Sequence, residues 1–115
     1  MYNTLREAKQ LGISKIKAGV SGADVHQTVV DFFKDRGYES GTRGFVHNLG
    51  HGVGLQVHEL PTVGPAGTVL ATGNVITVEP GLYYPGIGGV RLEDIGSVTA
   101  RGFDNFTLFP EDLVV

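Results

Sequence analysis

The stretch from His47 to Leu60, HNLGHGVGLQVHEL, holds the residues of this 115-residue chain that are best suited to chemistry. It contains three of the four histidines, with glycines closely spaced among them. A neutral imidazole can bind a metal ion, and it can also exchange a proton near neutral pH. Glycine lets the backbone approach a bound group closely. The pattern predicts a loop or strand end folded around a ligand, and a metal held there would need acidic oxygens to complete its coordination.

Two carboxylates occupy positions where they could supply those oxygens. Glu79 follows the β-branched run VITV and precedes Pro80-Gly81, so it stands where a strand breaks. Glu93 lies in the largely apolar run VRLEDI, where a carboxylate is costly to bury unless it is paired or metal-bound. If these segments are antiparallel neighbours, both carboxylates can face one spot. An ion pair, for example between Glu93 and Arg91, is the alternative interpretation.

Other kinds of site find less support in the sequence. The absence of cysteine excludes disulfides, thiolate metal sites and a cysteine nucleophile. The serines lack a nucleophile-elbow context, and the glycine-rich segments lack the strand and helix setting of phosphate-binding loops. What remains is a mixed nitrogen and oxygen donor set of the kind that suits Mn, Co, Fe or Zn.

Composition limits the partners and the location that we expect. The formal net charge is −3 and the basic residues are scattered, so nucleic acid is not an expected partner. No apolar run is long enough for a membrane span, and the amino terminus has no apolar signal-peptide core. We therefore expect a cytoplasmic protein without a membrane partner.

Two helices are predicted in the first third of the chain. Over residues 3–16 apolar residues recur every third position, which is typical of an amphipathic helix. Over residues 23–36 they recur at helical spacing from Val25 to Phe33, and Gly37 is suited to end the helix. His26 lies on this second helix and is interpreted as a solvated residue.

After Tyr38 the pattern changes to short β-branched runs separated by Gly, Pro and Asn. Strands are predicted over residues 75–79, 82–84, 90–99 and 105–109, and the turn-rich segment 85–89 favours antiparallel pairing. No boundary or internal repeat divides the chain. The sequence thus predicts a single α+β domain over residues 1–115, with two helices packed on one face of an antiparallel sheet.

Three ordered motifs, HNLGHGVGLQVHEL, VITVEPGLYY and GGVRLEDIG, resemble the C-terminal half of the catalytic domain of the pita-bread metallopeptidases. The GGVRLED version of the last motif is closer to the Xaa-Pro aminopeptidase and prolidase (Xaa-Pro dipeptidase) branch than to the methionine aminopeptidases. The resemblance implies half of a pita-bread fold, hydrolysis of Xaa-Pro peptide bonds and a centre of two divalent metal ions (Mn, Co or Zn).

Matched position by position, the resemblance implies that His51, Glu79 and Glu93 are metal ligands. Glu79 is also implied in proton transfer, and Glu93 in bridging the two metals. The resemblance further implies that His47 and His58 hold the substrate and stabilise the tetrahedral intermediate.

The resemblance also implies that Arg91 braces the carboxylates, and it implies an incomplete site. The family completes its centre with two aspartates on a strand pair that precedes the helix matching residues 2–16, and this chain begins at that helix. Three of five protein ligands are therefore expected. We expect a fragment with little or no peptidase activity alone. The alternative is a non-catalytic association module, either homodimeric or in complex with a separately encoded N-terminal half.

Overall fold

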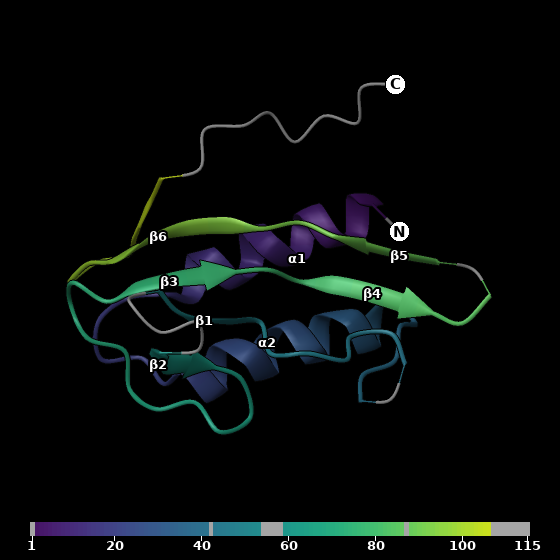
Figure 1. Ribbon diagram of the computed structural model, residues 1–115, viewed down its shortest axis with the longest axis horizontal. Helices are drawn as coiled ribbons and strands as arrows, with labels where there is room; N and C mark the ends of the chain where they lie inside the picture. The colour runs from purple at the N-terminus through teal and green to yellow at the C-terminus, as the bar shows by residue number, and fades with distance from the viewer. Residues whose placement is uncertain (1, 42, 54–58, 87, 107–115) are drawn as a thin grey trace.

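The computed structural model describes residues 2–41, 43–53, 59–86 and 88–106. Two helices are followed by short strands (Figure 1). The elements are α1 Tyr2–Lys15, α2 Gly22–Asp35, β1 Gly50–Gly52, β2 Glu59–Val63, β3 Val75–Val78, β4 Gly81–Tyr84, β5 Gly88–Arg91, β6 Asp94–Val98 and β7 Phe103–Asn105. No helix among the described residues is long and apolar enough to cross a bilayer.

The strands form a five-stranded antiparallel sheet in the order β2-β1-β3-β6-β7 and a separate β4-β5 hairpin. Both helices pack on the same side of the strands (Figure 1). Helix α1 contacts β3 of the five-stranded sheet and β5 of the hairpin, and α2 contacts β2. The core between these layers consists of fully buried apolar side chains from both, among them Leu5, Val29, Phe33, Leu49, Ile76 and Val78. The predicted fold, two helices packed on an antiparallel sheet, is confirmed.

The second helix begins and ends as its sequence predicts. The Ser21 hydroxyl caps the start of α2 by accepting a hydrogen bond from the Ala23 N–H. Gly37 follows the helix with a φ of 86°, a conformation that favours glycine. The prediction for His26 is wrong, because its side chain is 6% exposed rather than solvated. Its spacing from Val29 and Phe33 places it on the inner face of α2.

The run predicted as one strand over residues 90–99 is divided in two. β5 ends at Arg91 and β6 begins at Asp94, opposite the break between β3 and β4. The β3-β6 pair and the β4-β5 pair keep the same register, since Val78 pairs with Asp94 and Gly81 pairs with Arg91. Pro80 interrupts the ladder because it has no N–H to donate. In Figure 1 the four strands accordingly form two long ribbons that run side by side, β3 into β4 and β5 into β6.

The last strand also differs from its prediction. β7 covers Phe103–Asn105 and pairs with β6, whereas the predicted strand began at Asn105. Residues 107–109 of that prediction lie outside the described residues.

Candidate functional site

The breaks in the two ribbons bring Glu79 and Glu93 together. Because the register on either side of the break is the same, Glu79 stands opposite Glu93, and Pro80 opposite Leu92. A hydrogen bond from the Leu92 N–H to the Pro80 carbonyl, 3.1 Å long, holds the ribbons at this point. The carboxylates predicted to share a spot therefore lie side by side at the gap between the two sheets.

His51 reaches the same gap from the neighbouring strand β1. Its backbone N–H donates to the Thr77 hydroxyl at 3.1 Å, and its ring Nδ1 donates to the Gly52 carbonyl at 2.9 Å. With the proton on Nδ1, the lone pair of Nε2 is directed outward. Nε2 lies 3.7 Å from Oε2 of Glu79, a side chain that is 14% exposed.

Burial and neighbouring charges at the gap change the pKa of Glu93. Partial desolvation of the Glu93 carboxyl raises its pKa above the usual range, and a hydrogen bond and charge repulsion with Glu79 raise it further. The positive charge of Arg91 and the nearby imidazole of His51 act in the opposite direction. The Arg91 guanidinium lies 4.0 Å from Oε1 of Glu79, and its side chain is half exposed.

His47 lies next to Gly81 at the start of β4, and one of its ring nitrogens has no hydrogen-bond partner among the described residues. Its Nδ1 contacts the Asn48 carbonyl at 2.7 Å, while Nε2 is buried and has no hydrogen-bond partner within the described part of the chain. Buried polar atoms without a partner are rare in folded proteins and often mark a functional group. Nε2 points toward Gly81, where a Cβ would lie only 2.9 Å from it, so glycine at this position leaves room for the imidazole.

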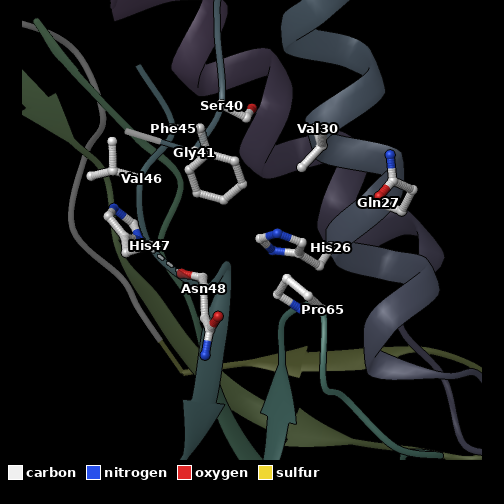
Figure 2. Close-up of a pocket in the computed structure, with 10 residues that line it drawn as sticks. All are labelled: His26, Gln27, Val30, Ser40, Gly41, Phe45, Val46, His47, Asn48 and Pro65. Atoms are coloured by element: carbon white, nitrogen blue, oxygen red, sulfur yellow. Dashed lines mark hydrogen bonds between the residues drawn. The ribbon is translucent and has the colours of Figure 1, made fainter. Parts of the chain in front are cut away.

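Sequence reasoning missed His26, whose ring is separated from that of His47 by the ring of Phe45. Figure 2 shows its imidazole reaching from α2 toward the segment that carries Phe45 and His47, at the edge of a pocket of about 360 Å³. Its Nδ1 accepts a hydrogen bond from the Leu49 N–H at 3.2 Å. Burial lowers the pKa of His26, and the charge of nearby His47 lowers it further. The signal that could have found this residue is its helical spacing with Val29 and Phe33.

A second residue missed by the sequence reasoning is Lys9, which is buried next to Asp94. Its ammonium group lies 3.0 Å from Oδ1 of Asp94, and the two side chains are 2% and 5% exposed. Asn105 donates to the other carboxylate oxygen of Asp94 at 2.6 Å. This pair joins α1 to the start of β6, the residue after Glu93.

The predicted site residues are thus partly brought together. His51, Glu79, Glu93 and Arg91 meet at the gap and His47 lies close by, whereas His58 is outside the described residues. Among the described residues, no group of three or more His, Asp or Glu side chains is gathered closely enough to hold a metal ion.

The donor set nevertheless suits a divalent cation in kind. An imidazole with its proton fixed on Nδ1 by a carbonyl is the form that binds a metal through Nε2. Two carboxylates beside it supply oxygen ligands and negative charge. These residues supply donors of the right kind, but the described residues do not gather them into a metal site.

Comparison with known proteins identifies relatives over the full chain. Residues 1–100 match the model of metallopeptidase family M24. The Xaa-Pro dipeptidase of Lactobacillus helveticus is 39% identical over 100% of this chain and 31% of its own length, and that of Pyrococcus furiosus is 36% identical over 99% and 32%. The chain therefore spans about a third of the length of these curated relatives.

Solved structures agree with the sequence matches. The Xaa-Pro dipeptidase from Bacillus anthracis superimposes with a TM-score of 0.90 at 43% identity, over 98% of this chain and 31% of that one. The prolidase from Pyrococcus furiosus gives a TM-score of 0.87 at 37% identity, over 95% and 32%. With its ordered motifs, its half of the pita-bread fold and these matches, the chain belongs to metallopeptidase family M24.

Proposed function

We propose that this chain supplies one part of the active site of a dinuclear-metal exopeptidase that cleaves Xaa-Pro peptide bonds. The observation that carries the proposal is the meeting of His51, Glu79 and Glu93 at the gap between the two sheets. The relatives are Xaa-Pro dipeptidases, which supports this substrate class.

In this proposal His51 Nε2 and the carboxylates of Glu79 and Glu93 hold divalent metal ions such as Mn, Co or Zn. Bound metal ions lower the pKa of a water molecule and polarise a scissile carbonyl. Glu79, the less exposed of the two proposed carboxylate ligands, would accept the proton of the attacking water and pass it to the leaving amine. Arg91 would keep the Glu79 carboxylate oriented through their 4.0 Å contact.

His47 would act on the substrate rather than on the metal. Because its Nδ1–H donates to the Asn48 carbonyl and fixes the ring, the buried Nε2 accepts a hydrogen bond from a substrate group when the ring is neutral and donates one only when the ring carries both protons. His58 is proposed to act beside it because of its place in the shared motif. Carrying both protons, these imidazoles would donate to the carbonyl oxygen and stabilise the charge that develops on it.

We further propose that the site is completed from outside this chain. Within the described residues the candidate ligands do not form a closed metal site, and the relatives are about three times as long as the stretch they share with it. Two further ligands would come from a region that corresponds to the remainder of those proteins.

Calorimetric titration with Mn²⁺, Co²⁺ and Zn²⁺ tests the metal half-site. We expect weak binding by the chain, which Glu93→Ala abolishes because it removes one of three ligands. Glu7→Ala is the matched control, since Glu7 is exposed and pairs with Arg36 away from the gap. Equal affinity in all three proteins, or no binding by the folded chain, would contradict the proposal.

A peptidase assay separates the half-site from a complete enzyme. With an Xaa-Pro dipeptide and Mn²⁺ we expect no measurable turnover from the chain alone. Turnover in the usual enzymatic range of about 1–10³ s⁻¹ would show that the site needs no further ligands. Recovery of activity on adding the remaining region of an M24 relative as a separate polypeptide would support completion from outside.

An association module is the second candidate function. Ile95 and Phe106 are exposed apolar residues beside the β7 edge of the five-stranded sheet, joined by a hydrogen bond from the Phe106 N–H to the Ile95 carbonyl. Exposed sheet edges and apolar patches favour association. We propose that this edge meets a second copy or the missing region, and sedimentation showing a clean monomer at micromolar concentration would count against a homodimer.

A further inference from the structure

His26 connects α2 to the segment from His47 to His51, called here the histidine segment. The side chain is buried, and the Leu49 N–H donates to its Nδ1 at 3.2 Å. A neutral imidazole has one accepting and one donating nitrogen, so this bond requires the proton of His26 to be on Nε2. Figure 2 shows the ring directed away from α2 and toward the segment it contacts.

Leu49 occupies a central place among the candidate site residues. It lies two residues after His47 and two before His51, and its side chain is fully buried. Its carbonyl accepts a hydrogen bond from the Glu79 N–H at 2.6 Å. The main chain of Leu49 is thus joined to α2 on one side and to Glu79 on the other.

A row of rings extends the same connection to His47. The His26 ring lies 5.1 Å from Phe45, and Phe45 lies 5.3 Å from His47 in an edge-to-face arrangement. Such ring pairs prefer defined geometries. The orientation of His47 therefore depends on α2 through Phe45 as well as through the backbone.

Among the described residues the Leu49 N–H takes part in no strand pairing, and its hydrogen bond goes to His26 on α2. A buried N–H without a partner is costly, so a side chain on α2 must supply the acceptor. Apolar residues of the same size at position 26 would fill the space without accepting this bond.

We infer that His26 is a positioning residue that holds the His47–His51 segment through Leu49 and so sets the orientation of both imidazoles at the gap. The importance of this orientation for catalysis rests on the proposed function. The hydrogen bond from the Leu49 N–H to His26 does not rest on the proposed function, and it can be tested without metal or substrate.

Amide hydrogen exchange of two variants tests the inference. His26→Leu fills the space but has no acceptor, whereas His26→Asn offers an amide oxygen close to the place of Nδ1. We expect Leu49 and Glu79 amides to exchange about 10-fold faster in His26→Leu, equivalent to about 1.4 kcal/mol. His26→Asn should return them toward the wild-type rate.

An internal reference separates this effect from general loss of stability. The Val98 N–H, which donates to the Asn74 carbonyl at 2.8 Å, lies at the far end of the sheet. The expected change is in the ratio of Leu49 exchange to Val98 exchange. An unchanged ratio in His26→Leu, or an equal rise in His26→Leu and His26→Asn, would overturn the inference.

A measurement on the wild-type chain keeps the inference testable if a variant does not fold. The ¹⁵N shifts of His26 should show an unprotonated Nδ1 and a protonated Nε2, with a coupling across the bond to the Leu49 nitrogen. A protonated Nδ1 would overturn the inference. Failure of the chain to bind metal would contradict the proposed function while leaving these readouts intact.

Discussion

The two halves of the candidate site are positioned by different means. Glu79 and Glu93 are placed by strand register, which a proline and a shared turn fix within a stretch of about 20 residues. His47 and His51 are placed by contacts from distant parts of the chain, with α2 on one side and β3 on the other. A carboxylate pair can therefore be predicted from local pattern, whereas the positions of His47 and His51 depend on contacts with residues that are distant in sequence.

The largest loss of stability is expected from removing the ion pair between Lys9 and Asp94, which lies next to the carboxylate half of the site, Glu79 and Glu93. Lys9→Met leaves the carboxylate of Asp94 buried without its cation, and removal of one partner of a buried pair costs about 3–5 kcal/mol. Urea unfolding followed by circular dichroism measures the loss. A result below 1 kcal/mol would show that the carboxylate half needs no support from α1.

Two further variants control the Lys9→Met experiment. Glu7→Gln removes the exposed ion pair with Arg36, whose side chains are about half exposed, and should cost about 0–1 kcal/mol. Lys9→Met combined with Asp94→Asn should recover part of the loss, because the group left buried is then uncharged. No recovery would indicate that packing of the Lys9 stem, rather than its charge, is what stabilises α1.

The next effect concerns the histidine half. A Cβ at Gly50 would overlap the Thr77 carbonyl, so Gly50→Ala must move β1 away from β3. Overpacking of this kind costs about 1–3 kcal/mol, and the shift should also weaken the bond from the His51 N–H to the Thr77 hydroxyl. Gly102→Ala is the control, since a Cβ there has open space. Equal midpoints of urea unfolding for the two variants would contradict the expected close packing.

Much of the fold could be predicted from sequence because it is local. Helical spacing and Gly37 placed α2 within one residue of its observed bounds, and the β-branched run VITV placed β3. The meeting of Glu79 with Glu93 followed from antiparallel pairing. The split between β5 and β6 was missed, because Leu92-Glu93 continues the alternating pattern and only the opposing Pro80 interrupts the ladder.

The supporting residues could not be predicted in the same way. Lys9 and His26 are polar residues on helices, and such residues are mostly solvated. Their burial depends on partners at positions 94 and 49, which only the folded structure brings near. The assignment of His51, Glu79 and Glu93 as metal ligands still rests on the resemblance and remains a prediction.

The smallest expected effect is a pH dependence that isolates His26. Its pKa is lowered, first by burial and then by His47, so between the folded and the unfolded pKa the unfolded chain binds more protons than the folded one. Stability from a neutral His26 is therefore complete above the ordinary pKa of about 6.5 and is lost as the pH falls through that value to the lowered pKa, where the loss levels off. Protonated His26 also cannot accept from Leu49, so the histidine half should loosen in acid before the carboxylate half does.

Comparison with His26→Asn tests this expectation, because asparagine does not titrate while His47 and the other histidines remain in both proteins. Urea unfolding between pH 7.5 and pH 5 should show wild-type stability falling more steeply than that of the variant. Leu49 amide exchange should rise in the same pH range in the wild type and stay level relative to Val98 in His26→Asn. Parallel profiles would mean that the acid sensitivity of the histidine half comes from His47 itself, and that α2 holds this segment by packing alone.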